Sequence, residues 1–198
     1  MKKNKKIGKI IVISAPSGAG KTTICNEIIK SDKNTIYSIS YTTRKPRGNE
    51  KNGVEYFFTD IANFKKMLKA DKFVEWAKVH DNYYATPKSF LSKTIKSGIN
   101  ILLDVDVQGG MKIKKHFPQA CLIFIKVPSI KALRERLIKR GQDNSEIIKM
   151  RIKNAKKEMQ FINKYDYVVV NDDLEESISA VKAIIKSLDY KITSKGAL

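Results

Sequence analysis

Continuous apolar runs and amphipathic helical patterns alternate along most of this chain. Four runs rich in isoleucine, leucine and valine predict buried strands at residues 9–14, 100–104, 121–127 and 167–170. Helical patterns lie between and after them, at residues 21–30, 87–97, 129–139, 145–163 and 174–188. Strands that alternate with helices form a parallel sheet covered by helices on both faces. The pattern therefore predicts an α/β fold.

The pattern changes between residues 36 and 86. Short runs at residues 37–42, 54–59 and 73–78 favour strands, and residues 62–69 favour a short helix. We interpret this region as a strand-rich lobe inserted into the α/β core.

Composition narrows the class of protein. With 198 residues and 42% hydrophobic content the chain is expected to bury one core, and no apolar run is long enough for a bilayer span or a signal peptide. Cys25 and Cys121 lack the spacing of a disulfide framework or a zinc site. We therefore expect a single-domain cytoplasmic protein with no membrane partner, and the sequence does not decide between a monomer and a homo-oligomer.

The net charge of +19 is typical of proteins that bind a polyanion. The lysines, however, are scattered over the predicted helix surfaces, so no nucleic-acid partner is predicted. Arginine is rare, because only six of the 39 basic residues are arginines, at positions 44, 47, 134, 136, 140 and 151. A planar guanidinium grips phosphate through two hydrogen bonds in a way that lysine does not. The arginines are therefore candidate site residues.

A glycine-rich segment joins the first predicted strand to the first predicted helix. Its sequence, Ala15-Pro-Ser-Gly-Ala-Gly-Lys-Thr22, matches G-x-x-x-x-G-K-[ST] except that Ala15 replaces the first glycine. In this motif the glycines let N–H groups converge on phosphate, the lysine reaches the β and γ phosphates, and the hydroxyl binds Mg²⁺. A glycine-rich turn without a ligand would not need the Lys-Thr pair. We predict an ATP site formed by Ala15, Pro16, Ser17, Gly18, Ala19, Gly20, Lys21, Thr22 and Thr23, with Mg²⁺ on Thr22.

Several segments are similar to one known family. The stretch Ser40-Tyr-Thr-Thr-Arg-Lys-Pro-Arg-Gly48 resembles the GMP-binding signature of guanylate kinases, and residues 73–76, 82–84, 103–109 and 170–173 match further family segments in the same order. The resemblance covers residues 9–188. It implies transfer of the γ-phosphoryl group of Mg-ATP to GMP, and to dGMP, which gives ADP and GDP in guanine nucleotide recycling.

The resemblance also implies how the single domain, residues 1–198, is organised. A P-loop NTPase-type core is expected at residues 7–35, 97–136 and 158–190, with a GMP-binding lobe at 36–96 and a helical lid at 137–157.

The chemistry of the lobe agrees with a guanine site. Guanine presents two neighbouring donors and one acceptor, so it needs a carboxylate beside hydroxyl groups. Glu75 can supply the carboxylate, and Ser40 and Thr86 can supply the hydroxyls. On a regular strand Glu75 shares its face with Phe73 and Ala77, an apolar setting in which a hydrogen-bonded carboxylate discriminates strongly against adenine. The alternative is a solvated glutamate on a strand.

A nucleoside monophosphate also needs groups that bind its phosphate. Arg44 and Arg47 lie three residues apart around Pro46, and Tyr56 and Tyr84 can add hydroxyl donors. Ordinary loop charges and core tyrosines are the alternative, which fits any one of these residues but not the set.

Three further arginines follow in the region that resembles the family's lid. Arg136 and Arg140 lie four residues apart on one helix, and Arg151 lies on the next. We expect them to stabilise the charge on the transferred phosphoryl group when the lid closes and excludes water. Together with Lys21 and Arg44, these arginines are the predicted catalytic residues.

Polar residues follow the second and fourth predicted core strands. Asp104 and Asp106 lie at the carboxyl end of the second strand, where open α/β sheets place their ligands. By resemblance Asp106 contacts GMP and Asp104 lies near Mg²⁺, reached through water, although either could be a plain cap at the strand end. Asn171 is predicted to contact the adenine of ATP.

Two other functions stay open from the sequence. A non-catalytic guanylate-kinase-like scaffold would bind a phosphorylated peptide in the lobe, but such domains typically have an eroded P-loop, whereas Lys21 and Thr22 are present. A P-loop kinase for another small phosphorylated acceptor would keep the loop and lack the guanine-binding group. His80 and His116 have no partner pattern and are expected to be structural.

Overall fold

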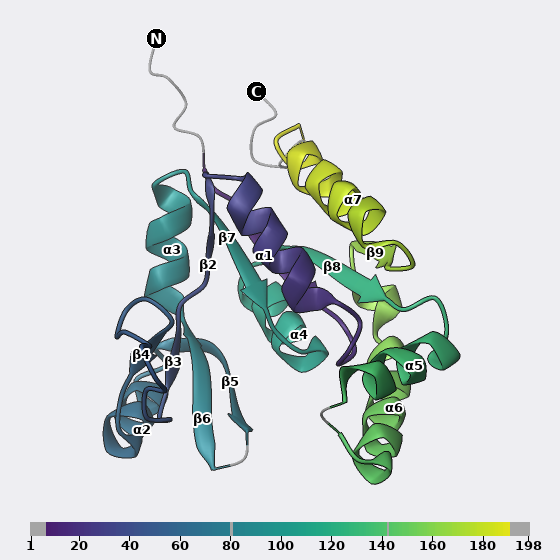
Figure 1. The fold of residues 1–198 in the computed structure, drawn as a ribbon. Helices are drawn as coiled ribbons and strands as arrows, with labels where there is room; N and C mark the ends of the chain where they lie inside the picture. Colours follow the sequence, from purple (N-terminus) through teal and green to yellow (C-terminus); the bar gives the residue numbers. More distant parts are fainter. Residues whose placement is uncertain (1–6, 80, 142, 191–198) are drawn as a thin grey trace. The chain divides into compact units, whose positions relative to one another are not determined.

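The computed structural model describes residues 7–79, 81–141 and 143–190, which form an α/β structure (Figure 1). The chain divides into two compact units. The first comprises residues 1–12 and 34–120, and the second comprises residues 13–33 and 121–198. The predictions for His80 and for residue 142 of the lid lie outside the described residues.

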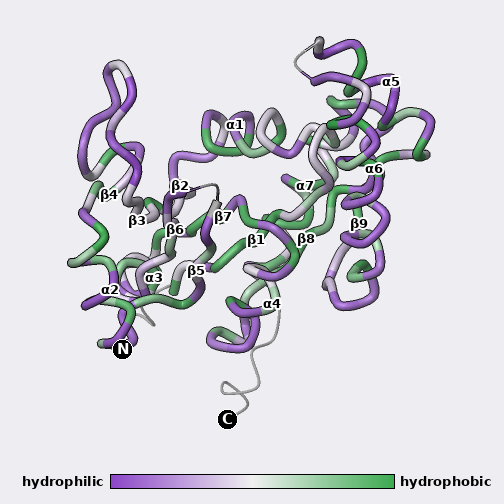
Figure 2. The backbone as a smooth tube through the Cα atoms, turned by 90° about the horizontal axis from the view of Figure 1, so that it is seen from below, coloured by the Kyte–Doolittle hydropathy of each residue, from purple (hydrophilic) through white to green (hydrophobic). Residues whose placement is uncertain are grey.

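Five strands form the main sheet, in the order β2-β7-β1-β8-β9. Their bounds are Ile10–Ser14 for β1, Thr35–Tyr37 for β2, Asn100–Asp104 for β7, Cys121–Lys126 for β8 and Tyr167–Val170 for β9. In the first unit β2 pairs in parallel with β7, and in the second unit β8 pairs in parallel with β9. β1 and β8 are continuous buried runs, coloured as hydrophobic in Figure 2. Such runs are what a parallel sheet flanked by helices requires.

The second unit contains four α-helices among its described residues. They are α1 (Lys21–Ser31), α5 (Ile130–Arg140), α6 (Ser145–Met159) and α7 (Leu174–Ser187), with a short 3₁₀ turn at Ile162–Lys164. α7 packs against both α1 and β9, and α5 packs against α6. The C-cap of α5 is Gly141, whose φ of 66° lies in the left-handed region that favours glycine. α6 begins after Asn144, whose side chain accepts a hydrogen bond from the N–H of Ile147.

The first unit contains a second, smaller sheet. Its strand order is β4-β3-β6-β5, with bounds Tyr56–Phe58 for β4, Ser40–Thr42 for β3, Asn82–Pro87 for β6 and Phe73–Val79 for β5. Three helices accompany the strands of this unit, namely α2 (Ile61–Lys69), α3 (Lys88–Lys96) and α4 (Val107–His116). The aromatic ring of Phe64 on α2 stacks on Phe73, and both pack with Ala85 in a small core.

Most predicted elements are confirmed to within a few residues, and the α/β fold class is confirmed. The run at residues 37–42 was expected as one strand, but it divides into the end of β2 in the main sheet and β3 in the smaller sheet. α4 was not predicted, because Gly109 and Gly110 in its first turns weaken the helical pattern. β6 was not predicted either, because it ends in Pro87, and proline is unfavourable within a strand. None of the helices in the described part of the chain combines the length and apolarity needed to cross a bilayer.

The side of β5 that Glu75 occupies also differs from the prediction. The pairing of β5 with β6 shifts register between Phe73 and Glu75, so that Val74 is an extra residue on β5. A β-bulge of this kind turns the residues on its two sides to opposite faces. Phe73 therefore packs with Ala85 in the core, whereas Glu75 lies on the other face, opposite Thr86. The prediction that Glu75 shares its face with Phe73 is wrong for this reason.

Candidate active site

The glycine-rich loop lies in the second unit, immediately before α1. Gly18 and Gly20 have φ of 90° and 88°, in the left-handed region that glycine adopts without steric cost. Ala15 does not have a positive φ and is buried, so the residue that replaces the first glycine of the motif fits without strain. Thr22 is exposed and Lys21 is half-buried at the start of the helix. The loop thus has the backbone form that lets N–H groups converge on phosphate.

Asn171, at the end of β9, supports this loop. Its Nδ2 donates a hydrogen bond to the carbonyl of Ala19 at 2.7 Å, and Ser177 Oγ lies 3.2 Å from its Oδ1. The side chain is buried, and a Cβ on Gly20 would collide with its Nδ2. In this conformation the amide holds the backbone of the loop in place. The contact between Asn171 and adenine stays a prediction.

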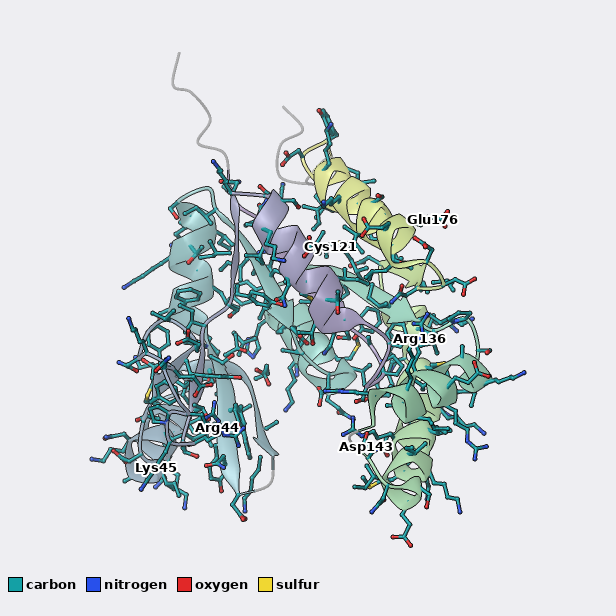
Figure 3. All side chains as sticks on the ribbon, viewed as in Figure 1. Arg44, Lys45, Cys121, Arg136, Asp143 and Glu176 are labelled. Atoms are coloured by element: carbon teal, nitrogen blue, oxygen red, sulfur yellow. The ribbon has the colours of Figure 1, made fainter. Side chains whose placement is uncertain are left out.

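Two of the three lid arginines are bound near the loop within the same unit. Arg136 on α5 donates to the carbonyl of Asn171 at 2.8 Å. Arg151 on α6 donates from Nη1 to Ser17 Oγ at 2.7 Å, and its Nη2 lies 2.9 Å from Oδ1 of Asp143. Arg140 is exposed in the last turn of α5. Figure 3 labels Arg136 and Asp143 on this part of the chain.

The predicted guanine-binding residues lie together on one face of the smaller sheet. Glu75 and Thr86 are register partners, and Thr86 Oγ1 donates to Glu75 Oε1 at 2.6 Å. Ser40 is the register partner of Tyr56, and continuing the register of β3 and β6 by one residue places Ser40 beside Thr86. Residues paired across strands point to the same face. Tyr56, Ser40, Thr86 and Glu75 therefore form a row of polar groups across four strands.

Glu75 is an acid in a poorly hydrated place. Burial raises the pKa of its carboxyl above the ordinary value, the charge of Asp106 raises it further, and the hydrogen bond from Thr86 opposes both effects. A carboxylate held in such surroundings is strongly attracted to N–H donors of a ligand. This environment, which the alternative of a solvated strand glutamate lacks, favours Glu75 as a binding residue.

Arg44, labelled in Figure 3, is the less exposed of the two arginines predicted to bind phosphate. Its side chain is 10% exposed, its Nη2 donates to Glu50 Oε1 at 2.9 Å, and its guanidinium lies 5.4 Å from the ring centroid of Tyr56. The ring of Tyr84 meets that of Tyr56 edge-on at 5.9 Å. Burial raises the pKa of Tyr56, so its hydroxyl stays a proton donor at neutral pH. Arg44, Tyr56 and Tyr84 thus come together as predicted donors to one phosphate.

Glu50 organises the loop that carries both arginines, and sequence reasoning did not assign it a role. One carboxylate oxygen accepts from Arg44, and the other accepts from the N–H of Arg47 at 2.8 Å. These hydrogen bonds lower the pKa of Glu50, so it remains a carboxylate at neutral pH. Arg47 itself is exposed. Two signals were available in the sequence: residues 50–53 belong to the segment that resembles the GMP-binding signature, and Glu50 is the only acid between residues 43 and 54.

Asp106 and Asp104 follow β7 in the first unit. Asp106 is the N-cap of α4, because its Oδ1 accepts a hydrogen bond from the N–H of Gly109 at 2.7 Å. The cap that was the alternative for this residue is therefore present, and a contact with GMP stays a prediction. Asp104 is half-buried at the end of the strand.

Taken together, a glycine-rich loop ahead of a helix and a separate group of arginines, tyrosines and a half-buried carboxylate define a P-loop protein with a second site suited to a phosphorylated base. The chain belongs to the guanylate kinase family. The family model described as guanylate kinase matches residues 7–188.

Individual relatives agree with this assignment. The chain is 48% identical over 181 residues to a guanylate kinase of Caldanaerobacter subterraneus subsp. tengcongensis, covering 91% of this chain and 88% of the relative. It is 42% identical over 198 residues to a guanylate kinase of Carboxydothermus hydrogenoformans, covering 96% and 97% of the two chains. The crystal structure of guanylate kinase from Anaplasma phagocytophilum is similar with a TM-score of 0.72 and 31% identity, covering 94% of this chain and 89% of that one.

Proposed function

We infer that this protein is an ATP:GMP phosphotransferase. It transfers the γ-phosphoryl group of ATP to GMP and releases ADP and GDP, the activity named for its relatives. The observation that carries the inference is the half-buried Glu75 with its hydrogen bond to Thr86, in a chain that keeps an intact phosphate loop. A scaffold without activity would need neither.

The first unit binds GMP in this proposal. Glu75 accepts from the N1–H and 2-amino groups of guanine, and the hydroxyls of Ser40 and Thr86 complete the set of partners. Asp106 adds a further contact to GMP. Adenine has no N1–H donor, so it would leave the half-buried carboxylate without a hydrogen bond from the ligand. None of these side chains contacts the 2′-hydroxyl, so dGMP is expected to serve as well.

The phosphate of GMP is bound by Arg44, Arg47, Tyr56 and Tyr84 in the same unit. Arg44 is supported for this role by its low exposure and by Glu50, which fixes its guanidinium. The two tyrosine hydroxyls add neutral donors, so the site attracts a phosphate dianion without an excess of mobile charge.

The second unit binds ATP through residues 15–23. Lys21 neutralises the β and γ phosphates, and Arg136, Arg140 and Arg151 stabilise the charge on the transferred group. The division into a core at residues 7–35, 97–136 and 158–190, a GMP lobe at 36–96 and a lid at 137–157 belongs to the same proposal. Transfer is direct, because positioning and electrostatics account for most of this chemistry.

Mg²⁺ is the proposed cofactor. In the part of the chain that the structure describes, no group of three histidine, cysteine or acidic side chains could hold a metal ion by itself. This fits Mg²⁺ bound chiefly by ATP, since that ion usually keeps several waters and takes one or two protein ligands beside the phosphates. The exposed hydroxyl of Thr22 is the proposed direct ligand, with Asp104 reached through water. When bound, Mg²⁺ neutralises charge that develops on the phosphate oxygens.

Replacement of Lys21 tests the proposed role of the loop. Lys21→Ala should lower kcat for GDP formation from ATP and GMP by ~10²- to 10³-fold, as expected for loss of one group that stabilises the transition state. Lys131→Ala, which removes an exposed lysine of α5, is the control and should retain normal turnover. Chelation of Mg²⁺ should stop the wild-type reaction. Normal GDP formation by Lys21→Ala would overturn the donor site, and turnover after chelation would overturn the cofactor.

A further inference from the structure

Asp143 is a buried carboxylate in the turn between α5 and α6. Its side chain is 5% exposed, and its Oδ1 lies 2.9 Å from Nη2 of Arg151. Within the described residues its Oδ2 is buried without a hydrogen-bond partner. Burying a carboxylate costs free energy unless it is paired, and the ion pair with Arg151 offsets part of that cost.

Asp143 lies in the turn immediately before α6, because the N-cap of the helix is Asn144, whose backbone is extended. Arg151 lies within the helix, so the ion pair joins the turn to α6. Helical side chains lean toward the N-terminus, which directs Arg151 back to the carboxylate. The cap formed by Asn144, whose Oδ1 accepts from the N–H of Ile147 at 2.9 Å, fixes the backbone next to Asp143.

The guanidinium of Arg151 uses its two ends for two different partners. Nη2 faces Asp143, whereas Nη1 donates to Ser17 Oγ in the phosphate loop at 2.7 Å. A free arginine samples many rotamers, but a planar fork bound at one end keeps only a few of them. The pairing with Asp143 thus selects rotamers in which the other end of the fork meets the loop.

We propose that Asp143 is a positioning residue that holds Arg151 at the phosphate loop, ready for the transferred phosphoryl group. The proposal rests on the role of Arg151 in phosphoryl transfer that is part of the proposed function. Asp143 touches neither substrate. It acts by reducing the number of conformations that Arg151 must give up when the nucleotide binds.

A double-mutant cycle tests this proposal with full-length protein. Asp143→Ala should lower kcat by ~10-fold, and Arg151→Ala by ~100-fold or more, in line with the loss of one charged group from a phosphoryl-transfer site. If Asp143 acts through Arg151, the double variant should be no slower than Arg151→Ala. KM for GMP should stay unchanged in all three proteins.

Two further variants separate positioning from general stability. Asp143→Asn keeps an acceptor of the same shape for Arg151 and should retain more activity than Asp143→Ala. Glu146→Ala removes an exposed acid from the first turn of the same helix and should have normal kcat. Melting temperatures of all variants show whether a loss of kcat exceeds any loss of folded protein.

The outcomes are distinct. Equal fold losses from Asp143→Ala in the wild-type and Arg151→Ala backgrounds would show an independent, structural role and overturn the proposal. Normal kcat in Asp143→Ala with slow Arg151→Ala would also overturn it and leave the proposed function intact. Normal kcat in Arg151→Ala would overturn the lid assignment and the proposal together.

Discussion

At the scale of single residues, two carboxylates of the first unit represent two physical classes. Glu50 accepts hydrogen bonds from Arg44 and from the N–H of Arg47, which lower its pKa, and it orders the cation beside it. Glu75 has one hydrogen bond from Thr86, and burial raises its pKa. The first class stabilises the folded site, whereas the second is destabilising until a ligand with N–H donors binds.

Glu75→Gln should be more stable than the wild type at neutral pH and should bind GMP less well. The folded-state pKa of Glu75 is raised above its ordinary value of 4.5, so the folded protein binds this proton more tightly than the unfolded chain does. The wild-type free energy of unfolding therefore falls as pH rises from 4.5 through the raised pKa, and glutamine escapes this loss. KM for GMP should rise by ~10- to 100-fold, because a charge-assisted hydrogen bond contributes about 1.5–3 kcal/mol.

The measurements for Glu75→Gln are urea unfolding at about pH 5 and about pH 8, and KM for both substrates. KM for ATP should not change. The same stability difference at both pH values would contradict the effect of burial, and an equal rise in both KM values would contradict the assignment to guanine.

Side chains with distinctive chemistry could be proposed from the sequence. Glu75, Thr86, Arg44 and Tyr84 were predicted from the resemblance to guanylate kinases and from what guanine and phosphate need. The structure places Thr86 beside Glu75, and Arg44 and Tyr84 beside Tyr56, while their roles stay predictions. Asp143 was missed because its partner Arg151 reaches Ser17, a residue 134 positions away in the chain. No spacing in the sequence predicts such a contact.

At the scale of elements, the phosphate loop depends on a strand end far along the chain. Asn171 follows β9, yet its amide holds the carbonyl of Ala19, 152 residues earlier, and leaves no room for a side chain at Gly20. The motif thus determines which residues face the phosphates, while β9 and α7 determine the shape of the backbone that carries them.

Gly20→Ala should therefore damage ATP binding selectively. The new Cβ would displace the amide of Asn171, and alanine at a φ of 88° adds about 1–2 kcal/mol of strain. KM for ATP should rise by ~10-fold or more, as about 1.4 kcal/mol corresponds to a factor of ten, and KM for GMP should not change.

The control for Gly20→Ala is a variant that loses a similar amount of stability elsewhere. Ser129→Ala removes the N-cap of α5, whose side chain accepts from the N–H of Ala132, and should cost about 1 kcal/mol without changing either KM. A rise in KM for ATP in both variants would attribute the effect to stability and refute the role of the Asn171 contact.

Hydrophobic pattern predicted the elements of the core better than those of the lobe. Continuous apolar runs identify β1, β7 and β8, because a parallel strand buries both of its faces. The strands of the lobe are short, and the bulge at Val74 reverses the alternation on which the face of Glu75 was predicted. A sequence pattern with a period of two does not reveal a single inserted residue.

At the scale of the whole molecule, a net charge of +19 is consistent with the two proposed substrates, ATP and GMP, because both are phosphate-bearing anions. Such a charge speeds the association of anionic ligands but does not distinguish one nucleotide from another. In the proposed function, selectivity comes from the row of polar groups on the smaller sheet, and above all from Glu75. Specificity for the acceptor base is therefore the central claim.

The most direct test is a coupled assay of ADP formation from ATP with GMP, dGMP, AMP, UMP and CMP as acceptors. We predict turnover with GMP and dGMP, and a kcat/KM for AMP that is lower by ~10⁴-fold, the discrimination expected when a buried hydrogen-bonding site loses its partner. A kcat/KM for AMP or for either pyrimidine nucleotide comparable to that for GMP would contradict the account.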